Sequence, residues 1–149
     1  MKTTIKCLML TLVAVFACVL ISSCSEDNVD PNKGIGNYYL QLSKVETNCL
    51  DANGKSIADA CKADWISANQ ADAQGKKNIG KTDRESARAW FDQFISALVQ
   101  AHDELYRGKN LLPEGGYIRY YFSMGSDAPN GGANEYATME VTNSGAVRN

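Results

Sequence analysis

The chain has 149 residues and a formal net charge of −2, with 15 Lys and Arg against 17 Asp and Glu. Its basic residues are scattered singly apart from Lys76 and Lys77, so no basic stripe is present on which a nucleic-acid backbone could lie. We therefore exclude nucleic-acid binding and expect a single domain, which is what a length of about 150 residues indicates.

The N-terminus has the features of a targeting segment. Lys2 and Lys6 supply positive charge ahead of a predominantly apolar run over residues 7–21. A helix that spans a bilayer needs about 20 apolar residues, and this run is shorter. We therefore expect residues 1–23 to be a cleaved signal peptide rather than a membrane helix.

The apolar run ends at Ile21-Ser22-Ser23-Cys24, which is followed by Ser25-Glu26-Asp27. The first of these segments resembles the cleavage box of bacterial lipoproteins, in which the cysteine becomes the acylated first residue of the mature protein. The second resembles the acidic export tag of Bacteroides-type surface lipoproteins. The resemblance implies a lipid anchor on Cys24 and an outer-membrane location with the domain at the cell surface. A periplasm-facing domain on an ordinary acidic tether is the alternative.

Residues 24–37 are rich in Asn, Gly, Pro and charge, which predicts a flexible tether ahead of a single domain over 38–149. A strand is expected over 38–46, where leucines alternate with polar residues, and an Asn-Gly turn follows at 51–54. Residues 55–57 form either a short returning strand or the start of a helix. Residues 67–81 are polar and small, which predicts a surface loop.

Cys49 and Cys61 are the cysteines that remain beyond the signal peptide and the lipidated position. An even number of cysteines in an exported domain predicts a disulfide, so we expect Cys49 and Cys61 to be bonded across the turn. The alternative is two buried free thiols, which a poorly oxidising environment would leave reduced.

The strongest structural signal is a long helix that begins at Thr82 and ends before Gly108. Thr82 and Glu85 have the spacing of a capping box, in which each side chain bonds the backbone of the other residue. Side chains with apolar character then recur at intervals of three and four: Ala87, Phe91, Phe94, Ile95, Leu98, His102 and Leu105. A stripe of this kind has to be covered, and we expect a sheet to cover it.

Residues 117–124 and 135–142 both alternate between apolar and polar side chains, which predicts two strands. The turn-forming residues 125–134 connect them as a wide antiparallel hairpin, and Val147 with its neighbours is expected to fray. The predicted fold is α+β and two-layered, with one long helix packed on an antiparallel sheet of three to five strands.

No catalytic, metal or cofactor motif is recognisable. His102 is the sole histidine, and its place in the apolar stripe favours a buried structural ring over catalysis. Asp51 and Asn53 resemble the start of a calcium loop, but the further oxygen ligands do not follow. We therefore expect a protein without enzyme activity, metal or cofactor.

Tyr117, Arg119 and Tyr121 alternate with the apolar residues of their strand and are expected to project from the face opposite the helix. Exposed tyrosines beside an arginine can stack on a sugar or anchor a protein partner, whereas ordinary cross-strand aromatic pairing is the alternative. The expected function is a non-enzymatic binding module for a protein or glycan, held at the membrane by the lipid on Cys24. A small envelope hydrolase or hydrolase inhibitor, and a structural subunit of an outer-membrane complex, remain the competing hypotheses.

Overall fold

The computed structural model describes residues 34–128 and 135–149. The predicted signal peptide, the lipidation site at Cys24 and most of the predicted tether lie outside these residues. The described elements follow the order β1 (Gly36–Thr47), α2 (Ala58–Asn69), β2 (Lys76–Thr82), α3 (Arg84–Tyr106), β3 (Ile118–Ser126), β4 (Tyr136–Thr142) and β5 (Gly145–Arg148). Neither of these helices has the length and apolar character needed to cross a bilayer.

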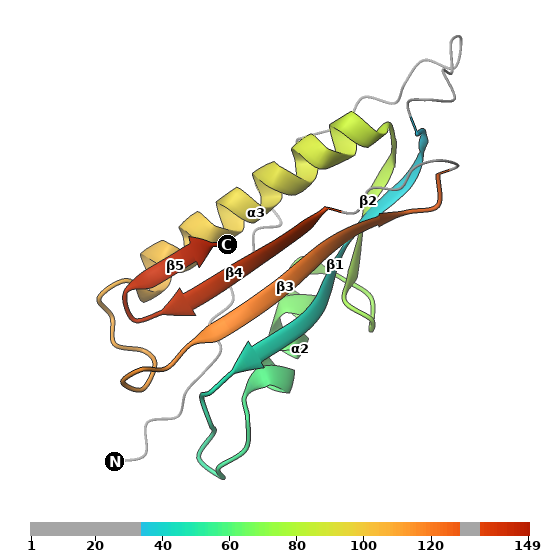
Figure 1. Ribbon diagram of the computed structural model, residues 1–149. Helices are drawn as coiled ribbons and strands as arrows, with labels where there is room; N and C mark the ends of the chain where they lie inside the picture. Colours follow the sequence, from blue (N-terminus) through green and yellow to red (C-terminus); the bar gives the residue numbers. More distant parts are fainter. Residues whose placement is uncertain (1–33, 129–134) are drawn as a thin grey trace.

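The five strands form one antiparallel sheet with the order β2-β1-β3-β4-β5 (Figure 1). The predicted α+β architecture is confirmed, with one long helix on an antiparallel sheet. Strand β3 is the middle strand, and β1, β3 and β4 are each paired on both sides.

Both helices cover the same face of this sheet (Figure 1). The ring of Trp65 in α2 lies 5.7 Å from that of Phe122, and the ring of His102 in α3 lies 5.9 Å from that of Tyr120. Tyr120 and Phe122 are buried alternate residues of β3, so they point to one side of the sheet. The core therefore lies between the sheet and the two helices, and the other face of the sheet is left open.

The N-cap residue of helix α3 lies one position later than predicted. Asp83 is the N-cap residue, and its carboxylate accepts the backbone N–H of Ser86 at 2.8 Å and the Ser86 hydroxyl at 2.9 Å. Thr82 is instead the last residue of β2, where its buried hydroxyl has no hydrogen-bond partner among the described residues. The predicted capping box between Thr82 and Glu85 is therefore wrong, although the helix itself is confirmed.

Residues 55–81 contain more regular structure than we predicted. Leu50 and Ser56 form an isolated β-bridge and α2 starts two residues later, so this segment combines both of the alternatives left open by the sequence. The surface loop predicted over 67–81 is wrong. Helix α2 occupies its first residues, and β2 pairs with β1 at the edge of the sheet.

Two turns of the same construction flank α2. Residues 51–55 and 72–76 share the pattern Asp-Ala-x-Gly-Lys. In each turn the Asp Oδ1 atom accepts the backbone N–H groups two and four residues later, at distances of 2.8 to 3.0 Å. The glycines have φ angles of 75° and 80°, which a side chain would disfavour. The second turn leads directly into β2.

The predicted disulfide between Cys49 and Cys61 is not formed. Cys49 carries a free, buried thiol whose sulfur lies 3.7 Å from both Asn48 Oδ1 and the carbonyl oxygen of Tyr117. The thiol of Cys49 therefore lies beside the residue that precedes β3.

Strand β5 is ordered, although we expected the chain to fray there. Asp103 of α3 accepts the backbone N–H of Ala146 at 2.9 Å and forms an ion pair with Arg107 at 2.8 Å. Gly145 has a φ of 121°, and a Cβ atom at this position would lie 2.0 Å from Asp103 Oδ1. A side chain of α3 therefore holds β5 in place, and only glycine fits beside it.

Candidate functional site

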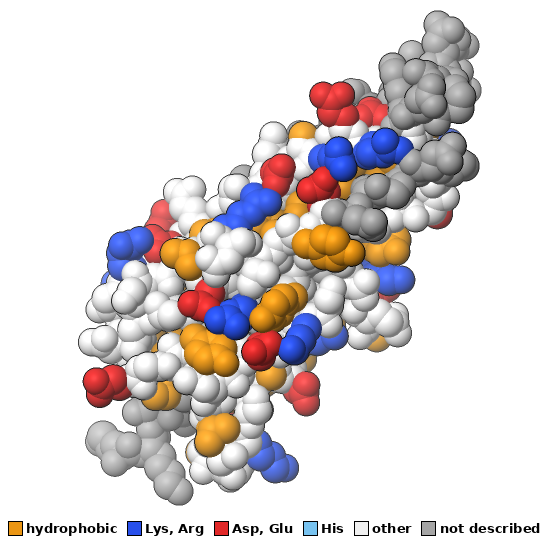
Figure 2. Space-filling view, in the orientation of Figure 1, with side chains coloured by type: hydrophobic (Ala, Val, Ile, Leu, Met, Phe, Trp, Pro, Cys, Tyr) orange, Lys and Arg blue, Asp and Glu red, His pale blue; other side chains and the backbone are white. Residues whose placement is uncertain are grey.

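The open face of the sheet carries charged and aromatic side chains from three strands (Figure 2). Tyr117, Arg119 and Tyr121 lie on this face because they alternate with the buried residues of β3. A β-bulge between Leu42 and Lys44 shifts the register of β1. The shift turns residues 44 and 46 to the open face, whereas the alternation that buries Leu42 would have placed them beneath the helices.

Arg119 is the centre of a charge network on this face. Its Nε atom donates to Glu140 Oε2 at 2.9 Å and its Nη2 atom contacts the same oxygen, while its Nη1 atom lies 4.0 Å from Glu46 Oε1. Glu46 Oε2 also accepts Lys44 Nζ at 2.7 Å and the Tyr121 hydroxyl at 3.2 Å. Tyr121 and Glu140 raise the pKa of Arg119, and the hydrogen bonds from Lys44 and Tyr121 lower the pKa of Glu46.

Three tyrosine rings on the open face each lie beside a cation. The distances from cation to ring centroid are 5.1 Å for Arg119 and Tyr117, 5.5 Å for Lys44 and Tyr121, and 4.8 Å for Lys76 and Tyr39. Within the described part of the chain, no ring-to-ring contact joins these tyrosines. In this structure each of these rings therefore contacts a cation and not another ring, unlike the aromatic pairing that we considered as the alternative.

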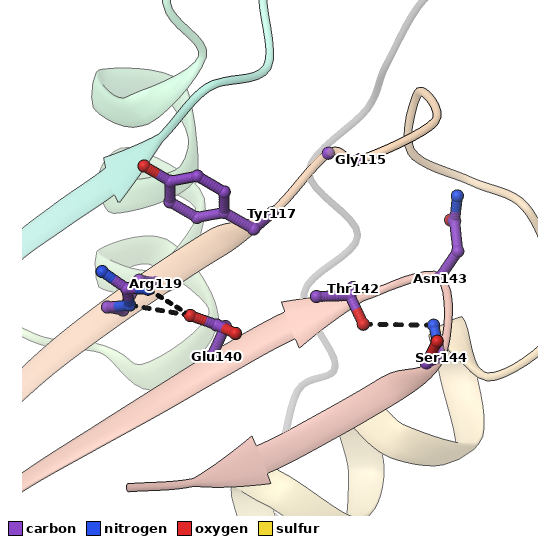
Figure 3. A pocket seen from close by; sticks show the side chains of 8 residues that line it. Gly115, Tyr117, Arg119, Glu140, Thr142, Asn143 and Ser144 are labelled. Carbon is purple, nitrogen blue, oxygen red and sulfur yellow. Dashed lines mark hydrogen bonds and ion pairs between the residues drawn. The ribbon is translucent and has the colours of Figure 1, made fainter.

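A shallow pocket of about 410 Å³ lies at the end of the open face where β3 begins and the β4–β5 turn projects (Figure 3). It is lined by Gly115, Gly116, Tyr117, Arg119, Glu140, Thr142, Asn143 and Ser144. Two of the three predicted binding residues thus line the pocket. The third, Tyr121, lies two residues along the same strand face. The residues from β4 and its turn were not identified from the sequence.

Hydrogen bonds to the backbone fix the walls of this pocket. The Asn143 side chain donates to the carbonyl of Leu112 at 2.8 Å and accepts its N–H at 2.9 Å. On the opposite side, Asn48 donates to the carbonyl of Gly115 at 3.0 Å and accepts the N–H of Tyr117 at 2.9 Å. The loop that forms the rim of the pocket is therefore fastened to the sheet at two points.

His102 lies in the core and takes no part in the pocket. Its side chain has no exposed surface, and its Nδ1 atom donates to the Leu98 carbonyl at 2.9 Å. The ring stacks on Tyr106 at 6.2 Å, and its Nε2 atom has no hydrogen-bond partner among the described residues. Burial lowers the pKa of His102, so the ring is neutral and inaccessible to a ligand in solvent.

This buried histidine should make stability depend on pH just below neutrality. Because the pKa of His102 is lower in the folded state than the unfolded value of about 6.5, the unfolded state takes up a proton first as the pH falls. The free energy of unfolding is therefore expected to decrease as the pH falls below about 6.5, and to be independent of this group above about pH 7.

The His102→Leu variant should lose this decrease, because no other histidine is present. It should keep the further loss of stability below about pH 4, where carboxylates of lowered pKa such as Asp103 become protonated. Urea unfolding at intervals between pH 4 and pH 8 measures both effects. An unchanged slope between pH 5 and pH 6.5 in the variant would show that another group is responsible.

The chain has no match among protein-family models, curated proteins or solved structures. Within residues 34–128 and 135–149, no three His, Cys, Asp or Glu side chains are grouped so that they could hold a metal ion. The candidate site is therefore defined by its geometry alone.

Proposed function

We propose that this protein is a lipid-anchored, non-enzymatic module of the bacterial cell envelope that binds a protein or glycan partner through the open face of its sheet. The proposed anchor is the acylated Cys24, because Ile21-Ser22-Ser23-Cys24 resembles a lipoprotein cleavage box. The acidic residues that follow favour a position on the outer membrane, with the domain at the cell surface.

The observation that carries the binding proposal is the one-sided packing of the helices. Both helices cover one face of the sheet, and Tyr117, Arg119 and Tyr121 stand together on the other face beside a pocket. Tyrosine and arginine are the residue types most often found at the energetic centres of binding surfaces.

The chemistry of the open face supports binding rather than catalysis. A general acid near neutral pH requires a carboxyl group of raised pKa, whereas the pKa of Glu46 is lowered by its hydrogen bonds. The sole histidine is buried in the core. A structural subunit of a larger assembly would favour an apolar open face, and here the face carries ion pairs around Arg119.

The proposal is tested by a combined Tyr117→Ala, Arg119→Gln and Tyr121→Ala variant of the full-length protein. Retention on a glycan array, and recovery of an identified protein partner from the cell surface, are expected to fall at least tenfold relative to the unmodified protein, because these side chains form the proposed contact. Circular dichroism verifies that the variant is folded.

Gln93→Ala is the control, since Gln93 is exposed on α3, the helix that covers the opposite face of the sheet. Its retention should equal that of the unmodified protein. Undiminished retention of the folded triple variant would remove the proposed site.

A further inference from the structure

We infer that the pocket at the end of the open face is a subsite for a neutral saccharide. The inference rests on the proposed function and names the class of ligand that this part of the face accepts. The volume of about 410 Å³ lies within the range of small-molecule sites, which is about 300–1,000 Å³.

The charges that line the pocket cancel. Arg119 and Glu140 are the two charged side chains in its wall, and they are bonded to each other at 2.9 Å. An anionic ligand would have to draw Arg119 away from Glu140, and a cationic ligand would have to draw Glu140 away from Arg119. Either exchange leaves a charge without its partner, which is costly. A neutral ligand fits without breaking the pair.

The side chains in the pocket retain hydrogen-bonding capacity of both kinds. Glu140 bonds Arg119 through Oε2, and its Oε1 atom has no partner in the described structure. The hydroxyl oxygens of Tyr117 and Ser144 also have no hydrogen-bond partner in the described structure. Thr142 Oγ1 accepts the Ser144 N–H at 3.1 Å, and its own proton is available for donation. Figure 3 shows Glu140 between Arg119 and Thr142. Vicinal sugar hydroxyls, which both donate and accept, match such a mixed set.

Tyr117 adds the apolar surface that the C–H face of a sugar ring requires. Its ring is held by the Arg119 guanidinium at 5.1 Å, so it is placed before a ligand arrives. At Gly115 no atom lies within 4 Å of the position that a Cβ would take, so the rim is open there. Because the bonds of Asn48 and Asn143 already fix the loop, little further ordering is needed on binding.

The test uses saturation-transfer NMR and titration calorimetry on the full-length protein with defined sugars. The neutral probes are glucose, galactose, mannose and N-acetylglucosamine, and the charged probes are glucuronate and glucose 6-phosphate. At least one neutral sugar is expected to bind at least tenfold more tightly than the charged probes. Tyr117→Ala is expected to lower that affinity at least tenfold and Ser144→Ala at least threefold, whereas the control Gln93→Ala leaves it unchanged.

A second variant changes the specificity rather than the shape. Glu140→Gln keeps an acceptor for Arg119 and removes the compensating charge, so the ratio of glucuronate affinity to neutral-sugar affinity is expected to rise at least tenfold. An unchanged ratio overturns the argument from charge balance. The saccharide inference is also overturned if none of the neutral sugars binds, or if Tyr117→Ala binds them as the unmodified protein does.

Failure of the inference and failure of the proposed function give different results. If no sugar binds but the triple variant loses an identified protein partner, the pocket is not a saccharide subsite and the open face is still a binding surface. If the triple variant retains every partner and no sugar binds, both are overturned.

Discussion

Truncation of Trp65 to alanine is expected to lower the free energy of unfolding by about 3–5 kcal/mol. Trp65 has no exposed surface and packs its ring against Phe122 of β3, so its removal opens a cavity between α2 and the sheet. Stabilities of small domains are about 5–15 kcal/mol, so this loss is a large fraction of the total stability. Urea unfolding monitored by circular dichroism provides the measurement.

Trp65→Phe is the informative companion variant. The indole Nε1 atom of Trp65 is buried without a hydrogen-bond partner among the described residues, so phenylalanine removes a costly polar group while it keeps much of the ring. Its effect should be well below that of alanine, about 1–2 kcal/mol. A loss of less than about 1 kcal/mol for Trp65→Ala would mean that α2 does not belong to the cooperative core.

Replacement of Gly145 by alanine is expected to cost about 3 kcal/mol and to release β5 from the sheet. The φ of 121° is unfavourable for any side chain, and the new Cβ would lie 2.0 Å from Asp103 Oδ1. The carboxylate would have to move, which breaks its bond to the N–H of Ala146. Hydrogen exchange of the β5 amides, together with urea unfolding, should show both the local and the global effect.

Gly54→Ala separates backbone strain from the collision with Asp103. Gly54 also has a positive φ, of 75°, but no atom lies within 4 Å of its Cβ position, so its replacement should cost only about 1 kcal/mol. In the Asp103→Ala background the collision at Gly145 is absent. The loss of stability in the Asp103→Ala, Gly145→Ala double variant should therefore be smaller than the sum of the losses in the two single variants. Equal costs at Gly54 and Gly145 would contradict the proposed role of Asp103.

The elements that pack one continuous apolar side against the core were predictable from the sequence. The alternation in β1, β3 and β4 and the three–four periodicity of α3 identify these elements because each lies with one side against the core. The long helix and the alternating strands together also determine the two-layer class. The capping residue was misplaced by one position because Thr82 and Asp83 are both suitable N-cap residue types.

The two edge strands were missed for a physical reason. Strand β2 (Lys76–Thr82) buries one residue fully, so its sequence carries no alternating pattern. Strand β5 (Gly145–Arg148) has four residues, and a side chain of α3 holds it in place. The repeated Asp-Ala-x-Gly-Lys turn was a usable signal for β2, since its second copy ends where that strand starts.

The candidate site was predictable only within one strand. Alternation alone puts Tyr117, Arg119 and Tyr121 on one face of β3. The carboxylates that surround Arg119 come from β1 and β4, and their position depends on strand register. For Glu46 it depends also on the bulge in β1, whose sequence signal, two polar residues between Leu42 and Val45, the prediction did not use. The disulfide prediction failed similarly, because the spacing of Cys49 and Cys61 does not reveal which way each thiol points.

The direction of β1 determines where the pocket lies relative to the N-terminal segment. The strand enters the sheet at Gly36 and ends at Thr47, whose hydroxyl donates to the carbonyl of Tyr117 at the pocket. Its 12 residues, at about 3.3 Å each, place the pocket about 40 Å from the point where the N-terminal segment joins the sheet. In a domain tethered through that segment, as we propose, the pocket faces away from the anchor. A force between the tether and a bound ligand then acts along β1. The hydrogen bonds from β1 to β2 and β3 are loaded in shear, so many of them resist the force together. They do not open one after another from one end of the strand.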